Sequence, residues 1–288
     1  MTGLRFWLLF VACVTLGAAQ ESGAPTAAQI IEQIKAHVGV PWRTETVDTI
    51  KAGDPNTPVT GIATTMMATF DVLRRAAAEN KNLVITHEPT FYSHLDKVDT
   101  LEQEQDAVWA DKEKFIRDHH MVVWRFHDHW HLRRPDGIME GVLQTLGWQD
   151  RYNAETHLVT IPETTVDRLA AEVKTKLGAR ALRVVGAKEM KVTTIALQPG
   201  AGGTAGHRKS LQRSAVEVLI IGEVPEWETI EYVSDAAAQG KKKALILVGH
   251  IPSEQPGMEN CAVWLKTFLK NVPVGFVPTV EPFWMPAR

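Results

Sequence analysis

The sequence predicts a three-layer α/β fold with two lobes. Apolar runs of strand length alternate with segments of helical periodicity through most of the 288 residues, a pattern typical of layered α/β proteins and not of helix bundles or β-sandwiches. The second half of the chain repeats the alternation of the first. No low-complexity linker separates the halves, so we place a boundary near 150–153 within one α/β unit of residues 26–288. The first lobe then covers about 40–150 and the second about 154–288.

The composition is that of an ordinary globular protein. Hydrophobic residues make up 44% and charged residues 23% of the chain, which is enough apolar material for a large core. The formal net charge of −3 provides no overall attraction to nucleic acid. We therefore expect no nucleic-acid partner, and we expect the ligand to be a small molecule.

The first nineteen residues have the pattern of a secretory signal peptide. Arg5 precedes an apolar stretch at about 6–16, and the small residues 17–19 follow it. The stretch is short for a membrane span, so we predict a signal at 1–19, a polar linker at 20–25, and a periplasmic or secreted mature protein without a stable membrane span. The alternative is a protein anchored in the membrane by an uncleaved signal.

The segments of the first lobe follow the linker in a regular order. Thr26 is a candidate N-cap for a helix that Gly39 stops. The further segments expected are β-rich runs at 44–53 and 57–69, a helix at 70–80, a strand at 82–87, a helix at 104–120, a strand at 121–131 and a helix at 137–148. The order strand, helix, strand up to residue 87 predicts a right-handed βαβ unit whose second strand is buried.

The second lobe is expected to alternate strands and helices in the same way. The expected strands are 157–161, 181–185, 193–197, 216–223 and 244–250, and the expected helices are 164–178, 207–215, one ending at 239 and a last one ending near 270. Cys261 is a lone thiol within the last helical pattern. We expect it to pack in the core.

The buried strand at 82–87 ends in two side chains that can bind metal, His87 and Glu88. Open α/β sheets usually bind ligands at the carboxyl ends of their parallel strands. The side chains of an extended dipeptide point to opposite faces, so this pair serves two metals more easily than one. The structural alternative is a buried His bonded to a carbonyl, with Glu88 capping the next helix.

The segment 126–131 concentrates histidines at the end of another expected strand. If it is extended, His127, His129 and His131 share one face, and Asp128 points the other way. Imidazole and carboxylate together suit zinc, iron or manganese. We therefore predict metal ligands among these residues.

A third candidate pair follows the strand at 244–250. His250 and Glu254 are four residues apart, which places them on one face of a helix, and Pro252 favours a helix start there. A surface ion pair or a cap is the alternative interpretation.

The glycine-rich stretch 198–210 lies between an expected strand and an expected helix. Its backbone N–H groups are able to bind an anion, with His207 or Ser210 as catalytic helpers. A loop whose glycines only allow a tight turn is the favoured interpretation of the stretch.

These segments together resemble the NIF-three-like, YbgI-type dinuclear-metal family, also named GTP cyclohydrolase I type two homologues. The resemblance covers most of the mature chain in order, through the motifs FDVLRRAAAENKNLVITHEP, RFHDHWHLRRPDGIMEGVLQTLG, IALQPGAGG, VLIIGE and LVGHIPSE. It implies two similar α/β lobes with mixed sheets, a metal cleft between them, and a ring-shaped homo-oligomer, which in this family is often a hexamer. The signal peptide departs from a family that is mostly intracellular.

The family's ligands carry over to individual positions in this sequence. The resemblance implies that His87 binds one metal, that His250 binds the other and that Glu254 bridges them. Glu88 stands where the family has a second His.

The middle motif carries over with one exchange. His127 matches the leading His of the family, and His131 stands where the family usually has a ligating Asp. One imidazole and one carboxylate are thus exchanged between the two motifs, and the ligand set still suits two metals.

The leading hypothesis is an exported, metal-dependent hydrolase acting on a small cyclic amide, amidine or phosphoester. Two divalent ions, of zinc, manganese or iron, are its expected cofactors, and Glu88 or Asp128 is the candidate general base. The alternatives are a non-catalytic metal-binding scaffold that forms a ring-shaped oligomer and a structural α/β domain with incidental histidines.

Overall fold

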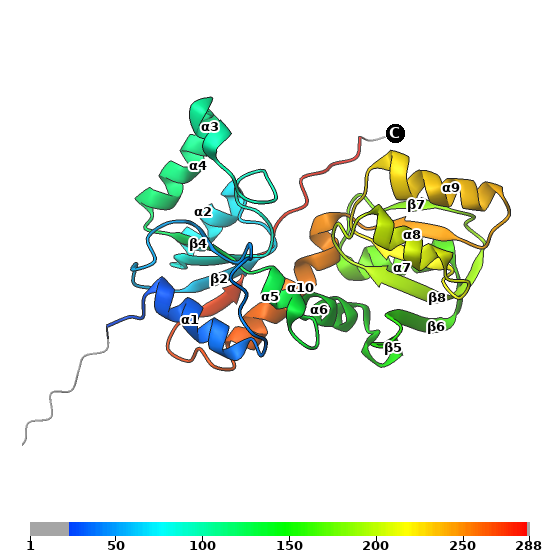
Figure 1. The fold of residues 1–288 in the computed structure, drawn as a ribbon, viewed down its shortest axis with the longest axis horizontal. Coiled ribbons are helices and arrows are strands. Elements are labelled where there is room, and N and C mark those ends of the chain that lie inside the picture. The colour runs from blue at the N-terminus through cyan, green and yellow to red at the C-terminus, as the bar shows by residue number, and fades with distance from the viewer. Residues whose placement is uncertain (1–22, 287–288) are drawn as a thin grey trace, which may run out of the picture.

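The computed structural model describes residues 23–286, and the chain forms two lobes that lie side by side (Figure 1). The predicted signal peptide and residues 20–22 of the predicted linker lie outside the described residues. Within 23–286, no helix combines the length and the apolar character needed to cross a bilayer.

The first lobe contains a five-stranded sheet. Its strands are β1 (Ile50–Ala52), β2 (Ile62–Thr65), β3 (Leu83–Thr86), β4 (Val122–Arg125) and β11 (Val274–Phe276), in the spatial order β1-β4-β3-β2-β11. β1 is antiparallel to β4, and the other neighbours are parallel. Every residue of β2, β3 and β4 is buried, as expected for parallel strands that are covered on both faces.

The second lobe contains a six-stranded sheet. Its strands are β5 (Tyr152–Asn153), β6 (Leu158–Thr165), β7 (Arg183–Val185), β8 (Lys191–Gln198), β9 (Val218–Ile221) and β10 (Ala244–Leu247), in the order β5-β6-β8-β9-β10-β7. β8, β9 and β10 are parallel, and the outer strands are antiparallel. Both sheets are therefore mixed, and the predicted α/β fold class is confirmed.

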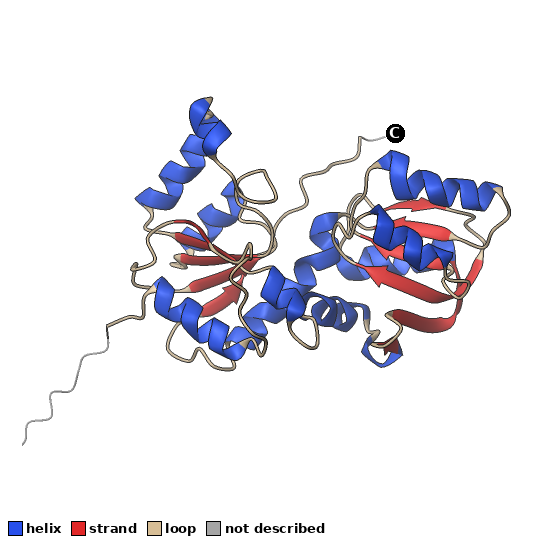
Figure 2. Cartoon of the chain, viewed as in Figure 1, coloured by secondary structure: helices blue, strands red, loops and turns tan. Residues whose placement is uncertain are grey.

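Helices cover both faces of each sheet (Figure 2). They are α1 (Ala27–His37), α2 (Phe70–Ala78), α3 (Asp99–Gln103), α4 (Ala107–Asp118), α5 (Asp128–Leu132), α6 (Gly137–Leu146), α7 (Val166–Leu177), α8 (Thr204–Gln212), α9 (Glu231–Ala238) and α10 (His250–Leu265), with short turns at Gln149–Arg151 and Glu226–Ile230. Thr26 caps α1 through a reciprocal capping box with Gln29, as its sequence position predicts.

The end of the chain belongs to the first sheet and not to the second. The sequence predicts a second lobe that runs to 288, but β11 pairs in parallel with β2, and the N–H of Val277 donates to the carbonyl of Thr64. Helix α10 carries the chain back across the molecule to this strand (Figure 1). Pairing with β11 covers the edge of β2, which removes a row of exposed backbone groups.

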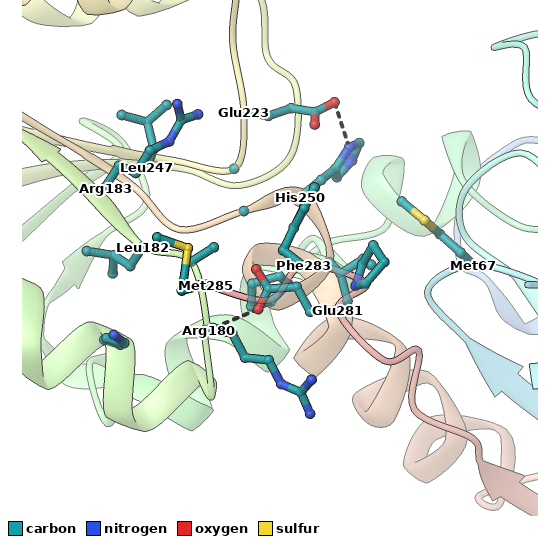
Figure 3. Close-up of a pocket in the computed structure, with 17 residues that line it drawn as sticks. Met67, Arg180, Leu182, Arg183, Glu223, Leu247, His250, Glu281, Phe283 and Met285 are labelled. Atoms are coloured by element: carbon teal, nitrogen blue, oxygen red, sulfur yellow. Dashed lines mark hydrogen bonds and ion pairs between the residues drawn. The ribbon is translucent and has the colours of Figure 1, made fainter. Parts of the chain in front are cut away.

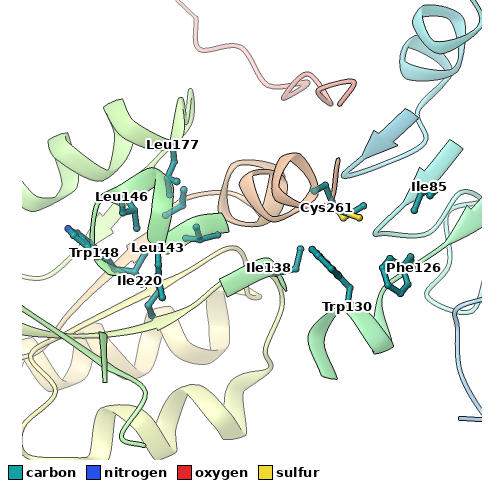
Figure 4. Close-up of a cluster of buried hydrophobic side chains, with 14 of the residues drawn as sticks. Ile85, Phe126, Trp130, Ile138, Leu143, Leu146, Trp148, Leu177, Ile220 and Cys261 are labelled. Atoms are coloured by element: carbon teal, nitrogen blue, oxygen red, sulfur yellow. The ribbon is translucent and has the colours of Figure 1, made fainter. Parts of the chain in front are cut away.

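Helices α6 and α10 join the two lobes. One continuous hydrophobic cluster extends through both lobes, and Figure 4 shows Trp130 and Ile138 of this cluster beside Cys261 of α10. Cys261 is buried, as predicted. The two helices approach closely because they meet at Gly141 and Gly257, where a Cβ atom would lie within 2.3 Å of the Pro256 carbonyl oxygen and 2.4 Å of the Ile138 Cα, respectively.

Replacing Gly257 with Ala is expected to destabilise the protein by about 1–3 kcal/mol, because the new methyl group forces α10 away from α6. Urea unfolding measures this change in free energy. Gly206→Ala is the matched control, because a Cβ at Gly206 in α8 meets no atom within 4 Å. Equal stability of the two variants would show that the helix contact is not tight.

Candidate metal centre

His87 lies at the carboxyl end of β3 and is fully buried. Its Nδ1–H donates to the carbonyl of Phe126 at 3.3 Å, which leaves the lone pair of Nε2 free. Nε2 is buried and has no hydrogen-bond partner among residues 23–286. Burial, together with the neighbouring His131 and His127, lowers the pKa of His87 well below its ordinary value. The side chain is thus a neutral imidazole that is ready to coordinate a cation.

His127 and His131 come from one turn of helix. The sequence pattern predicts an extended segment here, but β4 ends at Arg125, and His127 is the N-cap of α5. Residues four apart on a helix share a face, so both rings point at His87. The ring centroids of His127 and His131 lie 4.6 and 4.9 Å from that of His87. One nitrogen from each of the three rings lies within 4.8 Å of the others, a group able to hold one metal ion.

His129 points away from this group, contrary to its prediction as a ligand. Its Nδ1–H donates to Asp48 at 2.6 Å, and its Nε2 accepts the N–H of Arg43 at 2.9 Å. The ring is also stacked on Trp42, with 3.6 Å between centroids. Because the protein uses both ring nitrogens, His129 is a structural residue here.

Two glutamates and His250 form a second group of donors beside the first. Glu88 Oε1 lies 3.4 Å from His250 Nε2 and 3.7 Å from His127 Nε2. Glu254 Oε2 lies 3.1 Å from His250 Nε2 and 3.7 Å from His87 Nε2. The other oxygen of Glu254 is 4.0 Å from His131 Nε2. Glu254 therefore faces both groups, and His87, Glu88 and Glu254 also meet the geometry of a metal site.

Each of the four converging histidines is oriented through its second ring nitrogen. Besides the bond from His87 to Phe126, the Nδ1 atoms of the other three bond to carboxylates: His127 to Asp128 at 2.9 Å, His131 to Asp136 at 3.0 Å and His250 to Glu223 at 3.1 Å. Histidines that bind metal are usually held in this way, which fixes the tautomer and directs Nε2 at the ion.

The charge around His250 also favours a cation. Burial acts to lower the pKa of His250, but hydrogen bonds to Glu223, Glu254 and Glu88 outweigh it and raise the pKa to about 12. The carboxylates therefore favour a positive charge at this position, and a divalent cation at Nε2 would take the place of the proton. The set of imidazole nitrogens and carboxylate oxygens fits divalent zinc, manganese or iron.

Asp128 supports His127 and is poorly suited to be the general base predicted from the sequence. Its Oδ1 bonds to His127, and its Oδ2 accepts from the Thr46 hydroxyl at 2.8 Å and the Val47 N–H at 3.2 Å. Burial acts to raise the pKa of Asp128, but these bonds outweigh it and lower the pKa to about 2. A carboxylate of such low basicity accepts protons weakly.

Asp128→Asn is expected to weaken metal binding by about 10–100-fold, because such supporting carboxylates contribute that much through the ligand that they orient. Titration with zinc in the presence of a competing chelator measures the affinity. Asp150→Asn, which changes an exposed residue in the turn after α6, is the control. An unchanged affinity in Asp128→Asn would mean that His127 is not a ligand.

The centre opens into a cavity of about 500 Å³ between the lobes. Residues of the first lobe, including Glu88, Tyr92 and Lys112, line it together with Ala201, Glu223 and His250 of the second lobe. A cavity of this size admits a small molecule to the donor groups.

The comparison with protein families agrees with this geometry. A model of the family Duf34/NIF3 (NGG1p interacting factor 3) matches residues 41–282. The chain belongs to the DUF34/NIF3 family. The family resemblance stated from the sequence motifs is thereby confirmed.

This DUF34/NIF3 chain is also similar to individual proteins of known sequence or structure. The GTP cyclohydrolase 1 type 2 homolog of Clostridium acetobutylicum is 24% identical over 221 residues, which cover 73% of this chain and 77% of that protein. Staphylococcus aureus protein SA1388 has a similar fold, with a TM-score of 0.72 and 17% identity over 91% of this chain and 99% of that one. The structure of protein ybgI aligns with a TM-score of 0.68 and 18% identity over 90% of this chain and all of its own.

Sequence reasoning missed three charged residues that support the centre of this DUF34/NIF3 protein. Arg125 is fully buried and contacts Glu88 Oε2 at 3.2 Å, while Asp136 and Glu223 orient histidines. Arg125 and Glu223 carry a recognisable signal, because each ends or follows a buried strand as His87 does. Asp136 shows no such signal. In the sequence it looks like an ordinary helix N-cap, and it does cap α6.

The backbone of the glycine-rich stretch 198–210 passes close to Glu254 of the centre. Gly200 has a positive φ of 72°, and a Cβ there would lie 2.2 Å from Glu254 Oε1, so only glycine fits beside that carboxylate. The N–H of Gly200 donates to Ser253 at 3.0 Å. Ser210 accepts a bond from Gln198, and His207 bonds to Thr229. These contacts agree with the tight-turn interpretation of the stretch.

Proposed function

We propose that the protein is a metal-dependent hydrolase that uses a two-metal centre on a small cyclic amide, amidine or phosphoester. The observation that carries the proposal is the convergence of four imidazole Nε2 atoms and two glutamates, while the protein binds the Nδ1 atom of every one of those histidines. The buried, unpartnered Nε2 of His87 supports it, since a buried polar atom without a partner is costly unless a ligand uses it.

The donors divide into two sets. His87, His127 and His131 would hold one cation, and Glu88 with His250 would hold the other. Glu254 lies between them and would bridge. No thiolate contributes to the set, which favours Lewis-acid chemistry over a closed structural zinc site. When bound, the two cations supply Lewis acidity and activate water.

The protein's own residues would position the substrate and move the proton. Glu88 is held by Arg125 through Oε2, so Oε1 faces the donors. Burial acts to raise the pKa of Glu88, but the hydrogen bond and charge of His250 outweigh it and lower the pKa. Glu88 is thus anionic at neutral pH. It would either bind the cation or accept a proton at Oε1 from water.

Metal analysis of the purified protein tests the binding part of the proposal. We expect two divalent cations per chain after mild purification. Fewer than one per chain would count against a two-metal centre.

A hydrolase screen tests the catalytic part. With phosphoesters, cyclic amides and amidines as substrates, we expect turnover that a chelator removes and that returns with zinc or manganese. Full metal occupancy without turnover would favour the non-catalytic scaffold. Because the Clostridium acetobutylicum relative is a GTP cyclohydrolase 1 type 2 homolog, the screen also includes nucleotides.

Export and oligomer formation are also part of the proposal. Residues 1–19 support export by their pattern alone, and mass spectrometry of the mature N-terminus tests it; a chain that still begins at Met1 would contradict a cleaved signal. Exposed aromatic residues such as Trp227 and Trp284 support self-association. Light scattering should give the mass of a homo-oligomer, with a hexamer as the expected size; the mass of a single chain would contradict self-association.

A further inference from the structure

A second cavity, of about 570 Å³, adjoins the proposed metal centre (Figure 3). Met67, Glu223 and His250 line both this cavity and the one of about 500 Å³ described above. The two cavities therefore share a wall that contains a proposed ligand and the carboxylate that orients it. A molecule bound in the second cavity would lie against His250.

The walls of the second cavity are largely apolar. Leu182 and Leu247 contribute from the second lobe, Ile251 from α10, and Phe283 and Met285 from the C-terminal segment. Figure 3 shows Leu182, Leu247, Phe283 and Met285 among the side chains that line the space. Such walls favour an apolar ligand body.

One carboxylate interrupts these apolar walls. Glu281 is only 8% exposed and lines the cavity. Its Oε2 accepts the backbone N–H of Arg180 at 2.7 Å, but its buried Oε1 has no hydrogen-bond partner among the residues that the structure describes. A buried carboxylate oxygen without a hydrogen-bond donor destabilises the folded protein, because it has lost its hydration without compensation. Gly249 lies beside this oxygen in the folded chain and has no side chain to cover it.

The basic residues around the cavity do not satisfy that oxygen. Lys174, Arg180 and Arg183 line the cavity, and all three are exposed. The guanidinium of Arg183 pairs with Glu226 at 2.6 Å, and that of Arg180 points away from Glu281 in Figure 3. The cavity thus contains a buried carboxylate oxygen that can accept a hydrogen bond, and exposed basic side chains lie around it.

We propose that this cavity is a specificity pocket that binds an N–H-bearing group, such as an amine, an amidine or an amino-substituted heterocycle, carried on an apolar body. The N–H group donates to Glu281 Oε1, the apolar body packs on Leu182, Leu247 and Phe283, and the rest of the molecule reaches the edge of His250. The assignment of the ligand as substrate rests on the proposed hydrolase function. The binding itself does not.

Benzamidine and benzoate are matched probes, because they have the same ring and opposite charges. Calorimetric titration of the full protein should show saturable binding of benzamidine and at least about 10-fold weaker binding of benzoate. Glu281→Gln should weaken benzamidine binding by about 10-fold or more, because it replaces a charged acceptor with a neutral one. Equal affinity for the two probes, or no saturable binding of benzamidine, would overturn the proposal without any variant.

Glu172→Gln is the control variant. It removes one negative charge from α7, where Glu172 is exposed and pairs with Lys176 away from the cavity. It should leave benzamidine binding unchanged. An equal loss in Glu172→Gln and Glu281→Gln would reduce the effect to general electrostatics and refute a specific contact.

Repeating the titration with zinc and with chelator separates this proposal from the metal centre. Binding that depends on Glu281 in both conditions supports the pocket, even if no turnover is found. Metal-dependent turnover in a protein that does not bind benzamidine would leave the hydrolase proposal standing and refute the pocket.

Discussion

Replacing Glu254 with Ala is expected to abolish the two-metal centre. Glu254 is 3% exposed, and its two oxygens lie near His250, His87 and His131. It is the only carboxylate among the described residues that faces all three of these rings. Loss of a supporting residue alone weakens metal binding by about 10–100-fold, so loss of this donor should weaken it by more than about 100-fold.

Metal content and hydrolytic rate measure the effect of Glu254→Ala. We expect the content to fall below one cation per chain and metal-dependent turnover to disappear. Glu259→Ala is the control, because Glu259 is exposed on the same helix, α10. Two cations bound to Glu254→Ala with wild-type affinity would contradict the bridging role.

Replacing Arg125 with Met is expected to cause the largest loss of stability. The guanidinium is fully buried and donates to the carbonyls of His87 and His94. It also pairs with Glu88 at 3.2 Å and lies 3.7 Å from Asp96. Its removal takes the buried guanidinium away from the carboxylates of Glu88 and Asp96, and breaking such a buried pair costs about 3–5 kcal/mol. For a protein of this size the melting temperature should fall by roughly 10 °C.

Thermal unfolding with and without zinc measures the effect of Arg125→Met. The loss should be smaller with zinc, because a cation near Glu88 replaces part of the missing positive charge. Arg208→Met, at an exposed position on α8, should melt as the wild type does. A melting temperature of Arg125→Met within 2–3 °C of the wild type, an interval well inside the expected shift, would show that Glu88 and Asp96 do not depend on this arginine.

The sequence predicted well where local patterns decide the structure. The buried runs that form β3, β9 and β10 are evident from composition, and the strand-end rule then places His87, Glu88 and His250 at one edge of each sheet. Spacing on a helix adds Glu254. That these residues bind metal is still a prediction, but the structure brings their donor atoms together.

Sequence reasoning failed at α5, for a tertiary reason. Asp48 accepts the N–H groups of His127, Asp128 and His129 at 2.6, 2.9 and 2.9 Å. This distant carboxylate caps the first turn and so favours a helix over an extended segment. In a helix, residues four apart share a face, whereas in a strand residues two apart do. His127 and His131 therefore face the centre, and His129 turns into the core.

The sequence by itself determined the α/β class, the alternation of strands and helices and the donors that lie at strand ends, because these follow from hydrophobic periodicity and chain direction. Only the tertiary structure decided that β11 joins the first sheet, that Asp48 shapes α5 and that Arg125 supports Glu88. It also decided that Glu281 keeps a buried oxygen beside the centre. Each of these contacts joins residues that are far apart in the chain, where no local pattern fixes distance or direction.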